Sequence, residues 1–213
     1  MKLLTKIPRK INLAFSGGVD SLAAAKFLSN NHDVTLLHFN HGCEYSNTIE
    51  DGCRDLAKQL QLPIIVGKIG ESHTTGSLED FWRRNRYRFL RSFENHFITV
   101  HHLDDALSEF LFRMLHGEDK IIPIMDDKVL RPFLIVKKEE LVAYANQHGL
   151  KPVHDPYNFD LNGARNYIHE FIVPHALKIN PGMYKTIRKK YLRMIENGLV
   201  DIQALDGQDQ AEI

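Results

Sequence analysis

The stretch Ser16-Gly17-Gly18-Val19-Asp20-Ser21 decides how the rest of this sequence is interpreted. It stands between an apolar run over residues 11–15, typical of a short strand, and an Ala- and Leu-rich run over residues 22–28, typical of a helix. Two adjacent glycines let the backbone approach an anion closely, and a helix start presents free N–H groups and a positive dipole end. The stretch therefore predicts a loop that binds nucleotide phosphates, with added hydroxyl donors from Ser16 and Ser21.

Asp20 is the exceptional member of this loop, because a carboxylate beside phosphate groups repels them. A Mg²⁺ ion held by the carboxylate removes the conflict, so the pattern predicts Asp20 as a magnesium ligand. The alternative is an ordinary turn in which Ser and Asp side chains cap the helix. The loop lacks the Gly-Lys-Ser/Thr ending of a Walker A motif. It resembles instead the signature of the PP-loop, or N-type, ATP pyrophosphatases, which cleave ATP between its α- and β-phosphates.

Short apolar runs alternate with helical patterns through the first half of the chain. Strands are expected over residues 11–15, 34–39, 64–66 and 97–100, and helices over residues 22–28, 48–60, 78–93 and 103–115. This alternation predicts an α/β fold with a doubly wound parallel sheet. Later residues predict an extended stretch at 129–136, a helix at 138–148, and helical segments from 165 to about 197. We expect a nucleotide-binding domain over residues 1–135 and a small helical extension of it over residues 136–213.

Composition narrows the class of protein. No apolar run approaches the roughly 18 residues that cross a bilayer, and no secretory signal is recognisable, so a cytoplasmic protein without membrane association is expected. The 27 basic and 27 acidic residues argue against broad nonspecific nucleic-acid binding but allow a local basic patch. Two cysteines, Cys43 and Cys53, are too few for a zinc cluster. The oligomeric state stays open between a monomer and a homodimer.

Polar residues follow each strand at the edge where parallel strands end. His38 and Asn40 close the second strand, and we expect them to contact the nucleotide. His102, Asp104 and Asp105 follow the fourth strand. The two aspartates either cap the next helix or bind a metal or a substrate amine. His102 is either a core histidine or a polar contact to a phosphate or a base.

Two basic groups are candidates for contacts with phosphates. Arg83 and Arg86 stand three apart on one helix and could steady a polyphosphate or an RNA backbone, or form a solvated face. The densest basic cluster lies near the end of the chain and could contact RNA or be a solvated surface. It consists of Lys185, Arg188, Lys189, Lys190 and Arg193.

Several segments, in consistent order, resemble the catalytic domain of the tRNA(Ile)-lysidine synthetases, a family of PP-loop enzymes. His38-Phe39-Asn40-His41-Gly42 is similar to the family's His-Val-Asn-His-Gly, and His101-His102-Leu103-Asp104-Asp105 to its His-His-Leu-Asp-Asp. Glu79, Arg83, Arg86 and Tyr87 fall on its Glu-x-x-x-Arg-x-x-Arg-Tyr pattern. Further matches are Arg131-Pro132-Phe133-Leu134, Asp155-Pro156-Tyr157-Asn158, Asp160 and Arg165-Asn166.

The resemblance implies a reaction in two steps. ATP adenylates the C2 oxygen of the wobble cytidine in an isoleucine tRNA with a CAU anticodon, and the ε-amine of L-lysine then displaces AMP. ATP and Mg²⁺ would be cofactors, with pyrophosphate released. The implied catalytic residues are Asp20, Asp104, Asp105 and Arg83. The implied contacts to lysine or tRNA are His102, Arg86, Glu109, Arg165, Asn166, Lys185 and Lys189.

Several positions depart from the family pattern. Ser108 stands where the family has Glu, with Glu109 one step further along the helix, and His169 replaces an Arg. These changes bear on the lysine site more than on the ATP site. Two alternatives stay open: another PP-loop adenylating enzyme, such as a tRNA thiolase or a small-molecule ligase, and a catalytically silent nucleotide- or RNA-binding module. The absence of a CxxC motif counts against sulfur insertion.

Overall fold

The computed structural model of this chain describes residues 1–154 and 164–198. Six strands form one sheet in the order β3-β2-β1-β4-β6-β5. They are β1 (Lys10–Ala14), β2 (Asp33–Asn40), β3 (Ile64–Lys68), β4 (Phe97–Ile98), β5 (Met125–Asp126) and β6 (Val129–Leu130). The chain runs outward from β1 to β3 and then returns to place β4 on the other side of β1, so the strand order reverses there. In open α/β sheets such a reversal marks the crevice where ligands bind.

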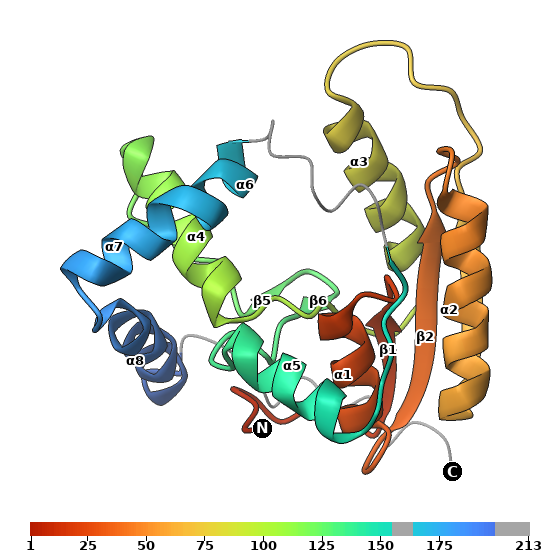
Figure 1. Ribbon diagram of the computed structural model, residues 1–213, viewed down its shortest axis with the longest axis horizontal. Helices are drawn as coiled ribbons and strands as arrows, with labels where there is room; N and C mark the ends of the chain where they lie inside the picture. The colour runs from red at the N-terminus through yellow and green to blue at the C-terminus, as the bar shows by residue number, and fades with distance from the viewer. Residues whose placement is uncertain (155–163, 199–213) are drawn as a thin grey trace.

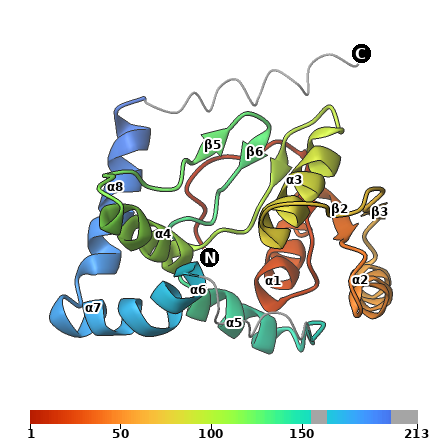
Figure 2. The same cartoon turned by 90° about the horizontal axis from the view of Figure 1, so that it is seen from above.

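The helices agree in number and order with the pattern expected up to residue 148. They are α1 (Val19–Leu28), α2 (Ser46–Leu60), α3 (Leu78–Arg91), α4 (Leu103–Leu115) and α5 (Lys138–Gln147), followed by α6 (Ala164–Tyr167), the π-helical segment η2 (Ile168–Ile172), α7 (Val173–Ile179) and α8 (Met183–Glu196). Figures 1 and 2 show α4, α7 and α8 gathered at one side of the molecule, with α1, α2 and α3 around the sheet. The α/β fold with added C-terminal helices is confirmed.

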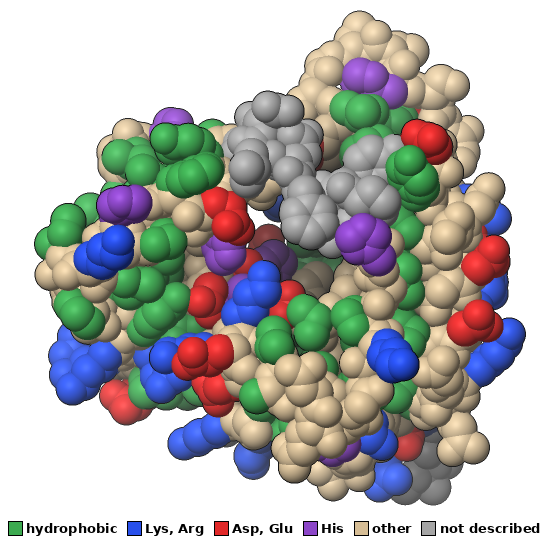
Figure 3. Space-filling view, viewed as in Figure 1, with side chains coloured by type: hydrophobic (Ala, Val, Ile, Leu, Met, Phe, Trp, Pro, Cys, Tyr) green, Lys and Arg blue, Asp and Glu red, His purple; other side chains and the backbone are tan. Residues whose placement is uncertain are grey.

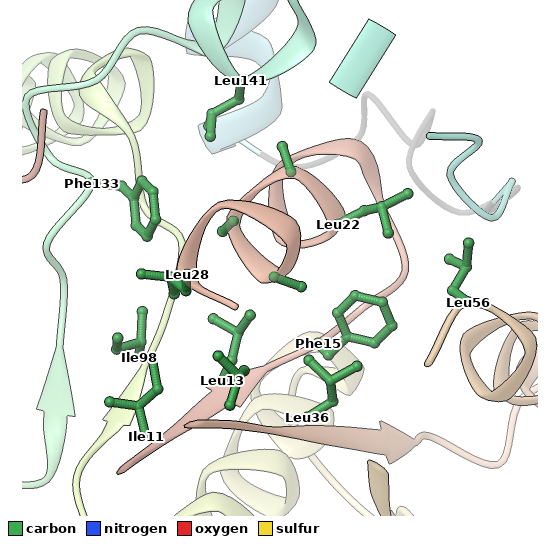
Figure 4. Packing of buried hydrophobic residues seen from close by; sticks show 14 of the residues in the cluster. Ile11, Leu13, Phe15, Leu22, Leu28, Leu36, Leu56, Ile98, Phe133 and Leu141 are labelled. Carbon is green, nitrogen blue, oxygen red and sulfur yellow. The ribbon is translucent and has the colours of Figure 1, made fainter. Parts of the chain in front are cut away.

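Helices cover both faces of the sheet, and successive buried side chains of its strands point to opposite faces. Leu36 of β2 packs in a cluster with residues of α1, α2 and α5, whereas the next residue, Leu37, packs with Leu90 of α3. This alternation follows from the two-residue period of a strand. Figure 4 shows Leu13 and Phe15 meeting Leu22 of α1 across the larger cluster. The doubly wound arrangement thus places α1 against the strand that precedes the glycine loop.

A second cluster joins the later helices to the sheet domain. Leu103 and Leu107 of α4 are fully buried together with Ile187 and Tyr191 of α8. The Tyr191 hydroxyl donates a 3.0 Å hydrogen bond to the carbonyl of Ile122, which secures α8 from within this cluster. The domain boundary expected between residues 135 and 136 stays a prediction.

The structure differs from the expected extended stretch at 129–136. Only Val129 and Leu130 form a strand there, and they pair antiparallel with β5 through a tight turn in which Asp127 has a φ of 51°. The strand stops before Pro132 because proline cannot donate a hydrogen bond to a neighbouring strand. The sheet is therefore parallel except for its edge strand β5.

The helical region expected from residue 165 onward is broken into pieces. Pro174 lies in the first turn of α7, where a missing N–H costs little. Asn180 is extended, as expected for a residue before proline, and it separates α7 from α8. In the parts of the chain that the structure describes, no helix combines the length and the apolar character needed to cross a membrane.

Candidate functional site

The glycine loop is fixed by its own backbone geometry. Gly17 has a φ of 78°, and a Cβ added there would lie 2.7 Å from Cys53 Sγ and 3.1 Å from a methyl of Val153. The Gly17 carbonyl also accepts a 3.0 Å hydrogen bond from the Val153 N–H. Only glycine combines this dihedral angle with this close packing. Gly17 is therefore required because Cys53 and Val153 pack directly against it.

The start of α1 is left open toward the site. Gly18 is the N-cap residue, and no side chain caps the helix. The Ser21 hydroxyl donates a 3.1 Å hydrogen bond to the Gly18 carbonyl and lies 3.2 Å from Ser16 Oγ, which in turn accepts a 3.3 Å bond from the Gly18 N–H. The alternative of Ser and Asp capping the helix is not what the structure shows. The free N–H groups of the first turn remain available to an anion.

Asp20 lies in the first turn of α1 with one oxygen unused. Its Oδ1 is buried and makes no hydrogen bond within the described residues, and its Oδ2 lies 3.7 Å from His102 Nε2. Burial raises the pKa of Asp20, and the nearby carboxylates of Asp105 and Asp104 raise it further, against the lowering effect of His102 and Lys138. A buried carboxylate oxygen without a partner is costly, and a cation would remove that cost.

The donor set fits Mg²⁺ rather than a metal held by the protein alone. Over residues 1–154 and 164–198, no cluster of three or more His, Cys, Asp or Glu side chains is arranged to hold a metal. Mg²⁺ commonly takes one or two carboxylates and completes its shell with substrate phosphates and water. Asp20 beside an open helix start meets that description.

The residues after β4 form a capping box. The Asp105 carboxylate accepts a 2.8 Å bond from the His102 N–H, while His102 Nδ1 accepts a 3.3 Å bond from the Asp105 N–H. The His102 ring is only 3% exposed. Since Nδ1 accepts, Nε2 carries the proton that faces Asp20. His102 is thus a buried histidine that connects the start of α4 to the glycine loop.

The carboxylate of Asp104 is bound within the protein. Its Oδ1 accepts a 2.6 Å bond from the Tyr184 hydroxyl, and its Oδ2 accepts a 2.8 Å bond from the Lys138 N–H. Asp104 therefore joins α4 to the start of α5 and to α8. It is not among the described residues that line either of the cavities defined next.

Two cavities meet at the glycine loop. The first has a volume of about 470 Å³ and extends along the end of β2 toward α3, and the second has a volume of about 950 Å³ and extends toward α4 and η2. Figure 3 shows the surface hollowed at the centre of this face, with acidic, basic and histidine side chains around the hollow. The two cavities share the side chains of Ser16, Asp20, Ser21, Tyr87 and His101.

The predicted site residues divide between these cavities. Those lining the first are Ser16, Asp20, Ser21, His38, Asn40 and Arg86. Those lining the second are Ser16, Gly18, Asp20, Ser21, Arg83, His102, Asp105, Glu109 and Asn166. Arg83 and Arg86, expected on one face, line different cavities, with the Tyr87 ring 5.3 Å and 5.7 Å from their guanidinium carbons. Residues 155–158 and 160, and the side chain of Arg165, lie outside the described part of the chain.

Asn40 is held by the protein on every side. Its amide nitrogen donates to Glu50 Oε2 at 2.8 Å and to Asn47 at 3.0 Å, and its oxygen accepts from the Gly42 N–H at 2.9 Å. These bonds use both amide hydrogens and one of the two lone pairs of the amide oxygen. The structure therefore gives Asn40 the task of shaping the turn after β2.

Glu50 lines neither cavity but holds Asn40 in the turn after β2, and the sequence pattern did not reveal this role. It is 5% exposed and is paired with Arg54 at 2.8 Å and Lys68 at 3.1 Å. Burial raises the pKa of Glu50, but hydrogen bonds from Asn40, Arg54 and Lys68 outweigh it and lower the pKa to about 2. The sequence does not indicate that Glu50 is buried, because its partners Asn40 and Lys68 come from β2 and β3.

Two positions that depart from the family pattern touch each other. Ser108 Oγ lies 3.0 Å from His169 Nδ1 and donates a 2.9 Å bond to the Asp104 carbonyl. Glu109 lines the same cavity and accepts a 2.7 Å bond from Arg113. The end of the second cavity thus combines a Ser–His contact with a Glu–Arg ion pair.

The basic cluster of α8 lies apart from both cavities. Lys185 and Lys189 are exposed, whereas Arg188 donates a 2.8 Å bond to the Ile135 carbonyl and Lys190 pairs with Asp119 at 2.8 Å. Part of the cluster therefore holds α8 in place, and part faces outward.

The open glycine loop at the reversal point of a doubly wound sheet defines a nucleotide-binding α/β domain. Residues 2–176 match the family model described as the PP-loop domain, and the chain belongs to that family. An NH3-dependent NAD synthetase from Campylobacter jejuni shares the fold with a TM-score of 0.51 and 16% identity, covering 97% of this chain and 89% of that one.

Curated tRNA(Ile)-lysidine synthases are similar to this chain in sequence. The protein from Persephonella marina is 30% identical over 193 residues, covering 82% of this chain and 43% of that protein. The protein from Pseudomonas aeruginosa is 30% identical over 217 residues, covering 91% and 48%. The resemblance expected from the sequence motifs is confirmed. The chain spans about half the length of these relatives.

Proposed function

We propose that this chain is the catalytic domain of a tRNA(Ile)-lysidine synthase, using ATP to adenylate the wobble cytidine of an isoleucine tRNA and then attaching L-lysine. The observation that carries the proposal is the junction of two cavities at the glycine loop, with Asp20 between them. A two-step reaction needs one space for the nucleotide and a second for the acceptor, both reaching the same α-phosphate. The similarity to curated tRNA(Ile)-lysidine synthases supplies the chemical identity.

The first cavity fits the nucleoside of ATP. Trp82 and His41 lie on its wall with ring centroids 5.7 Å apart, beside Arg86. Flat aromatic side chains suit a nucleobase, and the loop at the other end suits the phosphates. Mg²⁺ held by Asp20 would neutralise charge on the departing pyrophosphate. We assign contacts with phosphate oxygens to Arg83, which lines the second cavity beside Tyr87.

The second cavity fits an amine and its RNA acceptor. Five carboxylates line it, together with several basic side chains. The carboxylates are those of Asp20, Asp105, Glu109, Asp126 and Glu170. Carboxylates can bind an ammonium group, and one of them can take a proton from the amine, which must be neutral to attack. We assign that task to Asp105, because Asp104 has both oxygens bound by Tyr184 and Lys138.

Contacts to tRNA are assigned to the rim of the second cavity and to α8. Asn166 lines the second cavity, Arg86 lines the first, and Arg165 precedes Asn166 in α6. His102 is assigned no such contact, because its ring is buried in the capping box. The outward-facing Lys185 and Lys189 would meet the phosphate backbone. The cytoplasmic location and a homodimeric state stay predictions.

The proposal is tested by the product formed on the RNA. Incubation with ATP, Mg²⁺, L-lysine and isoleucine tRNA should release AMP and pyrophosphate and add the mass of lysine minus water to the anticodon cytidine. Omission of lysine should abolish the mass gain. A mass gain with another amine or with sulfur would assign a different PP-loop adenylating activity. Failure to release pyrophosphate with any acceptor would contradict an adenylating enzyme.

A further inference from the structure

Arg131 is a buried cation at the edge of the sheet where the strands end. It directly follows β6, is 6% exposed, and lines the second cavity. Among the described residues, its guanidinium group bonds only to the carbonyl of Pro123 and forms no ion pair. A buried charge is costly unless an opposite charge accompanies it. The environment of Arg131 therefore favours an anion that a ligand supplies.

The protein holds Arg131 in one position. Its backbone N–H donates a 2.9 Å bond to the Ile124 carbonyl, and its Nη1 donates a 3.0 Å bond to the Pro123 carbonyl. The preceding carbonyl, that of Ile122, accepts the bond from Tyr191 of α8. A side chain fixed in this way loses little conformational freedom when a ligand binds to it.

One end of the guanidinium group is left for a ligand. Nε is enclosed and has no partner within the described residues. Nη2 also makes no hydrogen bond there, but it is not enclosed, so its N–H groups are accessible from the second cavity. A ligand can therefore meet Arg131 at Nη2, through a charge-assisted hydrogen bond.

The neighbouring histidine supplies no counter-charge to Arg131. His101 follows β4, the strand beside β6, and lines both cavities. Burial lowers the pKa of His101 to about 3, and the charge of Arg131 is the first of several positive charges that act in the same direction. His101 is therefore neutral at physiological pH, and the positive charge at this end of the second cavity is not balanced by the residues beside it.

The surroundings indicate which anion fits. We assign the phosphates of ATP to the glycine loop, which both cavities share, whereas Arg131 lines the second cavity alone. A phosphodiester of RNA lies between two nucleosides, and both would crowd a side chain that is only 6% exposed. A carboxylate at the end of a small molecule can reach such a position. The same cavity carries carboxylates that suit ammonium groups, so its lining as a whole matches a free amino acid.

We propose that Arg131 Nη2 binds the α-carboxylate of the amino acid that reacts in the second step, and so selects an amino acid over a simple diamine. The inference rests on the proposed function, since it requires the attacking amine in the second cavity. A site built around a buried donor rejects an analogue that lacks the acceptor, because the donor is then left unpaired. The carboxylate at Arg131 and the ammonium groups at the acidic lining would hold the amino acid at both ends.

The test compares L-lysine with cadaverine, which is lysine without its carboxylate, in the reaction with tRNA, ATP and Mg²⁺. In the unchanged protein, kcat/KM should favour lysine by at least about 10-fold, the size expected for one hydrogen bond between charged groups. Arg131→Met should reduce this ratio to about 1 by raising the KM for lysine, and should leave kcat/KM for cadaverine within about 3-fold. Arg131→Lys keeps the charge in case Arg131→Met does not fold, and it should lower the ratio without abolishing it.

A matched control is available in α8. Arg188 also donates to a backbone carbonyl, that of Ile135 at 2.8 Å, but it lines neither cavity. Arg188→Met should leave the ratio for the two amines unchanged.

Separate binding measurements with ATP and with tRNA distinguish the other sources of an oxyanion. If Arg131→Met weakens the binding of either one and keeps the preference for lysine, the anion belongs to that substrate and this inference is wrong. Equal use of both amines by the unchanged protein would also overturn it, while the proposed function would stand. If the unchanged protein modifies the tRNA with neither amine, both the inference and the proposed function are wrong.

Discussion

Single residues in this domain act mainly by shaping the backbone around the two cavities. Gly17, Asn40 and His102 were expected at the site for contacts with ligand or metal. The structure shows Gly17 packed against Cys53, Asn40 bonded to Asn47, Glu50 and Gly42, and His102 in a capping box. These residues fix the positions of neighbouring residues, so substituting them should first lower local stability.

Gly17→Ala should destabilise the fold by about 1–3 kcal/mol, because alanine at a φ of 78° is strained and its Cβ would overlap Cys53 Sγ. Urea unfolding measures the change. Gly18→Ala is the matched control, since its Cβ would meet only Ser16 Oγ at 3.4 Å. Equal losses in the two variants would contradict the role given to Gly17.

Glu50 should make the free energy of unfolding depend on pH in the acidic range. Its pKa is lowered to about 2 from a usual 4.5, so its stabilising contribution is full above pH 4.5 and is lost as the pH falls toward 2. Glu50→Gln should therefore flatten the fall in unfolding free energy across that window. Asp55→Asn, on an exposed stretch of the same helix, should leave the slope as it was. An unchanged slope in Glu50→Gln would contradict the assignment.

The candidate site residues lie where helices begin and where strands end. α1 begins uncapped at the loop, α4 begins with the His102–Asp105 box, and β2 ends at His38 and Asn40. In α8, two of the five basic residues of the cluster, Arg188 and Lys190, hold the helix against the domain. The remaining lysines, Lys185 and Lys189, face outward.

Lys185→Gln with Lys189→Gln should weaken tRNA binding and reduce its dependence on salt, because each lost phosphate contact removes about one released counterion. The change should fall on tRNA affinity and leave ATP affinity unaltered. Filter binding at several salt concentrations measures the slope. Lys2→Gln with Lys58→Gln, also exposed, serves as the charge-matched control. Equal slopes in the two double variants would show that α8 is only a solvated face.

At the scale of the whole molecule, the sequence predicted the sheet, the loop and the edge where the site forms. Those features depend on local patterns: apolar period, adjacent glycines and polar residues at strand ends. The partners of Asp104 could not be predicted, because Tyr184 is 80 residues away and reaches it only through the packing of α8 on α4. The role of Glu50 was missed for the same reason, since the side chains of Asn40 and Lys68 reach it from β2 and β3 only in the folded chain.

The Cys53 thiol, which lies behind the glycine loop, is protected by burial from oxidation and alkylation. Cys53 is fully buried, and burial raises the pKa of its sulfur to about 12, so almost no thiolate exists at neutral pH. Peroxide or alkylating agents should therefore react first at the half-buried Cys43 and spare the support beneath Gly17. Modification should therefore act on the first cavity, which Cys43 lines, and leave the backbone of the glycine loop in place.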